Sequence, residues 1–147
     1  MKITVFKYQD LGPDRLYEIL KLRSEVFVVE QKCAYQDLDN KDEKALHLVG
    51  EKNNKIIAYT RIFKKGAFFK NSSIGRVLVK KKYRNKDYGR KIMTSSIEKL
   101  KKDPKEEIIE ISAQKYLLKF YSELGFEKAG EEYLEDNIPH VKMILKI

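Results

Sequence analysis

The stretch Val77-Leu78-Val79-Lys80-Lys81-Lys82-Tyr83-Arg84-Asn85-Lys86-Asp87-Tyr88-Gly89-Arg90 decides the fold prediction. Its apolar start belongs to the run Ser73 to Lys80, whose β-branched residues predict a strand buried on both faces. Beyond the basic residues, Tyr88 begins a segment whose apolar side chains recur at helical spacing. The stretch therefore predicts a strand, a basic turn and the start of a helix in direct succession.

Such a strand, turn and helix start suit a phosphate group. The first backbone N–H groups of a helix have no intrahelical partner, and the helix dipole places partial positive charge there. Gly89 lets the backbone approach a ligand closely, and Arg84, Lys86 and Arg90 can add charge-assisted bonds. Any basic strand-to-helix turn looks similar, so this pattern alone also fits an ordinary solvated turn.

The rest of the chain alternates strand and helix patterns. Upstream, the sequence predicts a first strand at Lys2 to Tyr8, a helix from Pro13 to about Val29, and a hairpin of Leu46 to Gly50 with Lys55 to Phe63. Downstream, it predicts a helix that ends at Asp103-Pro104, a strand at Ile108 to Ser112, a helix at Tyr116 to Leu124 and a last strand at His140 to Ile147. This order predicts an α/β domain in which helices cover a mixed sheet.

Composition limits the possible classes of protein. The 147 residues are 42% apolar, which supplies one core, and no linker divides them, so we expect a single domain over residues 1–147. Net charge is +9, which favours anionic partners, although dispersed surface lysines explain that charge equally well. The single Cys33 excludes an internal disulfide and argues against a zinc site, and we expect no metal. Without a signal peptide or an apolar run of about 20 residues, we expect a cytoplasmic protein with no membrane partner.

Two motifs resemble the GNAT superfamily of N-acetyltransferases. The family's pyrophosphate turn reads Arg or Gln, two residues, Gly, one residue, then Gly or Ala; Arg84 and Gly89 match it, whereas Asp87 replaces the intermediate Gly. Gln114 followed by Phe120-Tyr121-Ser122-Glu123-Leu124-Gly125-Phe126 looks like the family's strand-end amide, helix and Tyr-x-x-x-Gly-Phe signature. Arg23 with the segment 26–39, and residues 133–140, further resemble the ElaA-like branch, so the resemblance covers nearly the whole chain.

The resemblance implies a fold, a cosubstrate and a set of site residues. The fold is a GNAT-like mixed, mostly antiparallel central sheet with helices on both faces. The cosubstrate is acetyl-CoA, whose pantetheine would bind along a splayed strand while a backbone N–H near Leu78 polarises the thioester carbonyl. Tyr121 is the matching general acid for the departing thiolate. The matching cofactor-binding residues are Val77, Leu78, Val79, Arg84, Asn85, Lys86, Asp87, Tyr88, Gly89, Arg90 and Gln114.

Some roles stay open at this stage. Without its surrounding motif, Tyr121 reads as a core aromatic on an amphipathic helix. The general base has several candidates by topology, none of which stands out: Glu25, Glu30, Glu110 and His140. Both histidines, His47 and His140, also fit purely structural roles.

The leading interpretation is transfer of an acetyl group to a primary amine of a small molecule or peptide, with no metal. One alternative is a CoA-binding sensor or scaffold of the same fold without turnover, which Asp87 keeps open. Another is a nucleic-acid-binding module in which Lys80 to Lys86 contacts phosphates while Tyr83 and Tyr88 stack on bases. Monomer and homodimer fit the sequence equally well.

Overall fold

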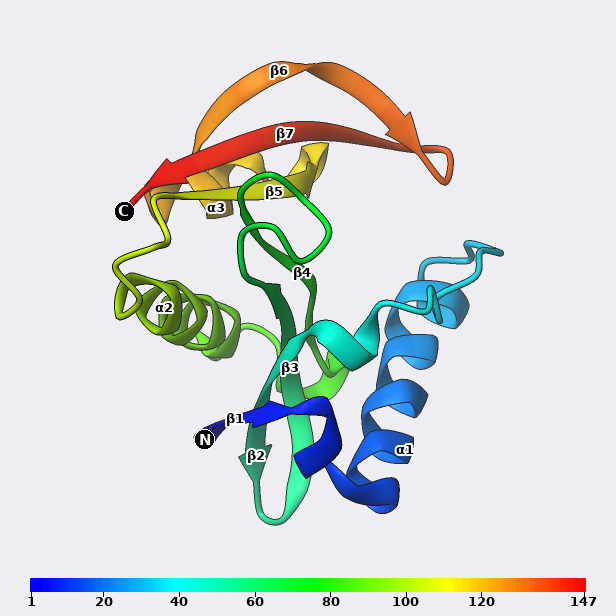
Figure 1. The fold of residues 1–147 in the computed structure, drawn as a ribbon. Coiled ribbons are helices and arrows are strands. Elements are labelled where there is room, and N and C mark those ends of the chain that lie inside the picture. Colours follow the sequence, from blue (N-terminus) through cyan, green and yellow to red (C-terminus); the bar gives the residue numbers. More distant parts are fainter.

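The computed structural model describes all 147 residues and consists of one sheet with helices on both faces (Figure 1). The strands are β1 (Lys2–Lys7), β2 (Leu46–Lys52), β3 (Lys55–Phe63), β4 (Ser72–Val79), β5 (Ile108–Gln114), β6 (Glu127–Glu135) and β7 (Ile138–Lys146). The helices are α1 (Gly12–Arg23), which continues with π-helical pairing over Ser24–Glu30, α2 (Tyr88–Lys101) and α3 (Leu118–Glu123). Short 3-10 turns occupy Tyr8–Asp10, Asp42–Lys44, Lys81–Tyr83 and Lys115–Leu117. None of the helices is both long and apolar enough to cross a membrane.

The sheet is mixed and mostly antiparallel. Its strand order is β1-β2-β3-β4-β5-β7-β6, and only β4 and β5 run parallel. The parallel pair requires a crossover, which α2 provides. The predicted fold class, with helices on both faces of a mixed sheet, is confirmed.

Two apolar clusters pack on opposite faces of the sheet. Successive strand residues point to opposite faces, so Leu48 and Val49 of β2 belong to different clusters. One face packs against α2 and α3 through residues such as Ile92 and Tyr121, and the other packs against α1 through residues such as Ile19. The helices therefore cover both faces of the central strands, and a site can form only where the strands end or separate.

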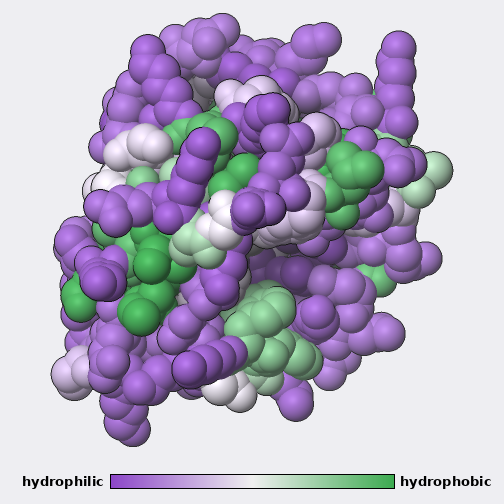
Figure 2. Space-filling view, turned by 90° about the horizontal axis from the view of Figure 1, so that it is seen from above, coloured by the Kyte–Doolittle hydropathy of each residue, from purple (hydrophilic) through white to green (hydrophobic).

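Strand β6 corrects the predicted element order, which contains no strand between α3 and the last one. All nine residues of β6 are exposed, so the segment has no alternation of buried and exposed residues that would mark a strand. Figure 2 looks onto the β6–β7 end of the molecule and shows mainly hydrophilic side chains there, with only separate hydrophobic groups. Pairing with β7, rather than burial, makes β6 a strand.

Strand β4 is also less buried than predicted. Ser72, Ile74 and Leu78 are buried, whereas the intervening residues and Val79 are only half-buried. Both faces of β4 do contact the core, since Ile74 belongs to the cluster on the α2 side and Leu78 to the cluster on the α1 side, but burial is incomplete along the cavity. The β-branched residues were correctly identified as a strand, but their density reports strand propensity rather than depth.

A buried ionic network fixes the segment between α1 and β2. Arg23, fully buried at the end of α1, donates to Asp37 at 3.0 Å and to Asp42 at 2.7 Å. Arg61 of β3 pairs with Asp39 at 2.7 Å and with Asp42 at 2.9 Å. Since a buried ion pair that loses one partner leaves an uncompensated charge, these contacts hold residues 37–42 in one place against the sheet.

The network should make stability depend on pH. Burial alone would raise the pKa of Asp39, but the hydrogen bonds and charge of Arg61 outweigh it and hold this pKa at about 2, below the usual 3.8. A carboxyl whose pKa is depressed in the folded state contributes stability above its unfolded pKa, and that contribution is lost as pH falls through the folded value. The window for Asp39 is therefore about pH 4 to about pH 2.

We expect Asp39→Asn to lower the free energy of unfolding at neutral pH, and we expect the gap to wild type to shrink as pH falls from about 4 to about 2. Chemical denaturation at a series of pH values measures this. Asp10→Asn, at an exposed position without an ion pair, is the matched control and should leave the profile unchanged. A gap that stays constant over the whole range would contradict the assignment.

Candidate active site

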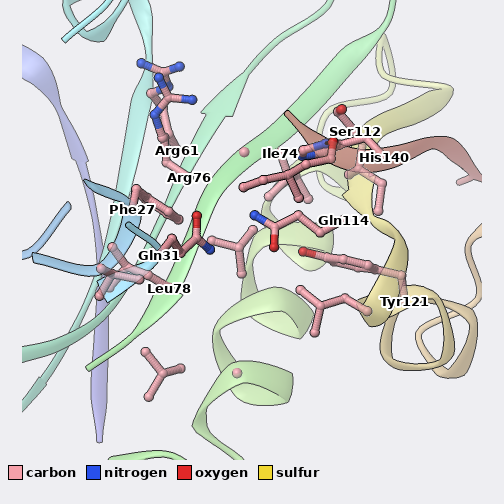
Figure 3. Close-up of a pocket in the computed structure, with 18 of the residues that line it drawn as sticks. Phe27, Gln31, Arg61, Ile74, Arg76, Leu78, Ser112, Gln114, Tyr121 and His140 are labelled. Carbon is pink, nitrogen blue, oxygen red and sulfur yellow. Dashed lines mark hydrogen bonds between the residues drawn. The ribbon is translucent and has the colours of Figure 1, made fainter. Parts of the chain in front are cut away.

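A cavity of about 980 Å³ opens where β4 and β5 separate. Figure 3 shows its walls: Phe27, Gln31 and Leu78 on one side, and Gln114, Tyr121 and His140 on the other. The wall residues come from the π-helical end of α1, from β4, from the start of α2, and from β5, α3 and β7. Segments far apart in the sequence therefore meet at this one opening in the sheet.

The opening exists because β4 pairs with β5 over only two residues. Ser72 lies opposite Ile109 and Ser73 opposite Glu110, and no further pairs follow. On its other edge β4 continues along β3, with a register shift beside Arg76, which has a positive φ of 50°. A non-glycine residue in this conformation marks a bulge, which bends the strand and strengthens its twist. The bulge therefore accompanies the point at which β4 leaves β5.

Beyond the bulge, backbone groups of β4 face the cavity. Lys80 donates its N–H to Ile57 of β3, so the preceding residue, Val79, points its own N–H and C=O away from β3. By the same alternation, the backbone groups of Val77 face that open edge, whereas those of Leu78 face Tyr59. The free donors thus flank Leu78 and do not include the N–H of Leu78 itself.

The turn between β4 and α2 presents six consecutive free amides. The backbone N–H groups from Asn85 to Arg90 form no hydrogen bond within the protein, and the first helical bond of α2 is from Lys91 to Asp87. Asn85 and Asp87 have left-handed backbones, with φ of 62° and 67°. Alternating conformations of this kind turn successive N–H groups toward one point and form a concave anion site. The amides of the turn that the sequence predicts as a phosphate site therefore have no partner within the protein.

The charged side chains of this turn are arranged differently from the prediction. Arg84 pairs with Glu30 at 2.6 Å and donates to the carbonyl of Val79 at 2.9 Å, so it ties the turn to the end of α1. Arg90 lies between Asp87 at 3.3 Å and Glu123 at 2.7 Å. Lys86 does not line the cavity, unlike the other predicted cofactor-binding residues. Backbone amides, rather than free cationic side chains, are therefore the main donors here.

The position of Tyr88 contradicts its role in the nucleic-acid-binding alternative. Its side chain is buried, and its hydroxyl accepts a hydrogen bond from Lys52 at 2.9 Å. A ring held in this way cannot stack on a nucleotide base. The predicted pairing of Tyr83 and Tyr88 as a base-stacking platform is therefore wrong.

Tyr121 and Gln114 lie on the wall opposite β4 (Figure 3). The Tyr121 ring packs edge-on against Phe120 and Phe126, with centroids 5.1 and 6.1 Å away. Its hydroxyl forms no hydrogen bond in the protein, and burial raises the pKa of this phenol above its usual 10. Tyr121 therefore stays protonated at neutral pH, with a donor directed at the cavity and nothing else to satisfy it.

The candidates for the general base differ in whether they line the cavity. Glu30 and His140 line the cavity, whereas Glu25 and Glu110 do not. His47 has the structural role that the sequence analysis allowed for it. Its ring nitrogens contact the Tyr59 hydroxyl at 2.7 Å and the Asp42 carbonyl at 2.9 Å. Burial lowers the pKa of His47, which keeps it neutral.

The sequence analysis did not identify several other residues in or beside the cavity wall: Gln31, Arg61, Arg76, Ser112, Tyr133 and Glu135. Of these, all but Tyr133 line the cavity directly, and Tyr133 contacts Ser112 and stacks on His140. The partners of these residues lie 5 to 39 residues away in sequence, for example 5 residues between Glu135 and His140 and 22 residues between Arg61 and Asp39. No local spacing could have identified them. A weaker signal was the cluster of acidic residues at positions 37, 39 and 42, which has no helical or strand period.

Comparisons with known proteins decide the family. A model described as "Acetyltransferase (GNAT) domain" matches residues 5–147. The chain belongs to the GNAT acetyltransferase family. It is therefore an enzyme, an N-acetyltransferase.

Individual relatives agree with this GNAT assignment. The chain is 36% identical to protein ElaA of Escherichia coli (strain K12), covering 95% of this chain and 93% of ElaA. It is 40% identical to a UPF0039 protein of Schizosaccharomyces pombe, covering 97% and 96%. The crystal structure of E. coli ElaA superimposes with a TM-score of 0.90 at 34% identity, covering 98% and 99%. An acyl-CoA N-acyltransferase from Pseudomonas aeruginosa gives a TM-score of 0.91 at 34% identity, with the same coverage.

Proposed function

We propose that this GNAT enzyme transfers the acetyl group of acetyl-CoA directly to a primary amine of a small molecule or peptide. The observation that carries the proposal is the run of six free amides from Asn85 to Arg90, next to the open edge of β4. An anion-binding turn and a strand edge with free donors, at the same end of one cavity, fit the diphosphate and the pantetheine of a CoA thioester. The P. aeruginosa neighbour, an acyl-CoA N-acyltransferase, supports a CoA thioester as the cosubstrate.

In this proposal the diphosphate binds the amides of the turn, and the pantetheine extends along β4. Val77 and Val79 supply backbone groups to the pantetheine and the thioester carbonyl, while the side chain of Leu78 points to the core on the α1 face. A backbone N–H aimed at the carbonyl oxygen stabilises the oxyanion that forms when the amine attacks. Gln114, at the end of β5, lies across the cavity from this edge.

Asp87 is compatible with an anionic ligand because of where its side chain lies. The carboxylate is 60% exposed and pairs with Arg90 at 3.3 Å, so its negative charge is partly neutralised. Its φ of 67° is the conformation that a glycine would adopt without strain, and Asp is among the residues that tolerate it best. The substitution in the family motif therefore preserves the shape of the turn.

Tyr121 acts as the general acid in this mechanism. As the tetrahedral intermediate collapses, the C–S bond breaks and the sulfur takes the phenolic proton. A thiol has a reference pKa of about 8.5, below that of the phenol, so complete proton transfer is uphill, whereas the hydrogen bond from Tyr121 strengthens as negative charge develops on sulfur. The free hydroxyl of Tyr121, buried among Phe120 and Phe126, is suited to this role.

Thermal unfolding with ligands tests the cofactor site. Acetyl-CoA at about 100 times its dissociation constant should stabilise the protein by about 2.7 kcal/mol, which raises the melting temperature by about 5 to 10 °C. A single-stranded oligonucleotide of equal charge is the control and should produce no comparable shift. Stabilisation by the oligonucleotide alone, with a steep salt dependence, would overturn the proposal in favour of nucleic-acid binding.

Tyr121→Phe tests the acid. We expect kcat to fall by about 10²-fold with the affinity for acetyl-CoA nearly unchanged, because general acid catalysis contributes about 10² to 10⁴-fold. The ring remains packed and only an unpaired hydroxyl is removed, so the fold should be preserved. Release of free thiol with a panel of primary amines is the measurement, and Tyr17→Phe, on an exposed part of α1, is the control. Turnover of Tyr121→Phe at the wild-type rate would exclude this role.

The CoA-binding sensor is the second candidate. It shares the cofactor site with the enzyme and differs only in the lack of turnover, so the same thiol assay separates the two. Binding of acetyl-CoA without thiol release from any amine in the panel would favour the sensor.

A further inference from the structure

Four polar side chains gather on the cavity wall formed by β5, β6 and β7. His140 contacts Glu135 through Nε2 and Oε2 at 3.4 Å, and its ring stacks on Tyr133 with centroids 6.0 Å apart. Ser112 contacts the hydroxyl of Tyr133 and donates to Glu135 at 3.2 Å. Register explains the gathering, because His140 is opposite both Gln114 of β5 and Tyr133 of β6.

The orientation of His140 leaves a proton acceptor available. Its Nδ1 lies 2.6 Å from the carbonyl oxygen of Ile138, and a carbonyl can only accept, so Nδ1 carries a proton. In the neutral ring the lone pair is therefore on Nε2, the nitrogen nearest Glu135. The His140 side chain is only 8% exposed. The hydrogen bond to the Ile138 carbonyl and the stacked ring of Tyr133 hold the imidazole in this position.

Glu135 and Asp136 are distinguished by their lack of a basic partner. Five carboxylates line the cavity, and three are paired with an arginine: Glu30 with Arg84, Asp39 with Arg61, and Asp87 with Arg90. Glu135 contacts only Ser112 and His140, and Asp136 forms no ion pair. In a chain with net charge +9, these two adjacent carboxylates thus place negative charge on this wall that no lysine or arginine pairs with.

We propose that Glu135 and His140 form the subsite for the ammonium group of the acceptor, with Nε2 of His140 as the general base. A primary ammonium carries only donors, and this wall supplies two acceptors: the carboxylate of Glu135 and the lone pair on Nε2. The proposal rests on the proposed function and adds to it a base and the charge of the acceptor.

The proton balance of the reaction is complete with these groups. An alkylammonium has a reference pKa of about 10.4 and cannot attack until it loses a proton. Nε2 takes that proton, and Glu135 stabilises the resulting imidazolium, which releases the proton to solvent along the exposed side of Glu135. The neutral nitrogen then forms the N–C bond, the C–S bond breaks, Tyr121 protonates sulfur, and the second proton lost by nitrogen restores Tyr121.

Binding of a small ammonium ion to the free protein tests the subsite without any cofactor. The probe is n-butylammonium, and 1-butanol is the neutral control of similar shape. We expect the probe, but not the alcohol, to shift the ¹⁵N resonance of His140 Nε2. Glu135→Gln should weaken the probe's affinity by about tenfold, since a hydrogen bond to a charged group is worth about 1.5–3 kcal/mol. Glu131→Gln, on the same strand but outside the cavity, should change it less than twofold.

An unperturbed His140 resonance, or equal affinities of Glu135→Gln and wild type, would overturn the subsite. Because this titration needs no acetyl-CoA and no turnover, its outcome is independent of the proposed acetyl transfer. Failure of transfer alone would show as an ammonium site that binds the probe in a protein that releases no thiol.

His140→Asn tests the base. The Asn amide can still donate to the Ile138 carbonyl, but it offers no basic nitrogen in place of Nε2. We expect kcat/KM to fall about 10²-fold for an alkylamine with pKa near 10.4, and clearly less for an amine with pKa near 7.7, of which a far larger fraction is already neutral at pH 7. An equal loss for both amines would indicate a structural role and overturn the assignment. If His140→Asn does not fold, the same pair of amines is compared in Glu135→Gln, with the same expected difference.

Discussion

Separation of β4 from its parallel neighbour is the constraint on which the rest of the structure depends. Only Ser72 and Ser73 pair with β5, and beyond the bulge at Arg76 the strand follows β3 alone. Unpaired backbone groups are costly when buried without a partner, so the opened edge requires either solvent or a ligand with matching hydrogen bonds. The cavity, its backbone donors and the wall carrying Tyr121 all follow from this one departure from regular pairing.

Ionic contacts hold in place the segments that surround the opening between β4 and β5. The segment 37–42 is clamped by Arg23 and Arg61, and Arg76 reaches the same segment from the bulge, pairing with Asp37 at 2.8 Å. The bulge is thus tied to α1 and β3 through a single set of buried charges. On the neighbouring side, Arg84 links the amide turn to Glu30 at the end of α1. These arginines are occupied with structure, which leaves the backbone to receive a ligand's negative charge.

The sequence predicted the parts of the site that lie within local motifs. The turn from Arg84 to Arg90 was predicted from its strand-to-helix pattern, whereas Gln114 and Tyr121 were predicted only through the resemblance to the GNAT motifs. Lys86 was predicted from its positive charge and its place in the turn, but it does not line the cavity, because a residue in a turn can face either side. Strand β6 escaped prediction because its exposed residues have no apolar period. The wall made by Glu135 and His140 depends on register between β6 and β7, which no single segment specifies.

The most direct test of this account is amide hydrogen exchange, measured by NMR on the wild-type protein with and without CoA. The amides from Asn85 to Arg90 and those of Val77 and Val79 should exchange rapidly in the free protein, because they have no internal partner, and should slow markedly when CoA is saturating. Protection of these amides in the free protein, or exchange that CoA leaves unchanged, would contradict the claim that an opened strand and a turn of free amides form the cofactor site.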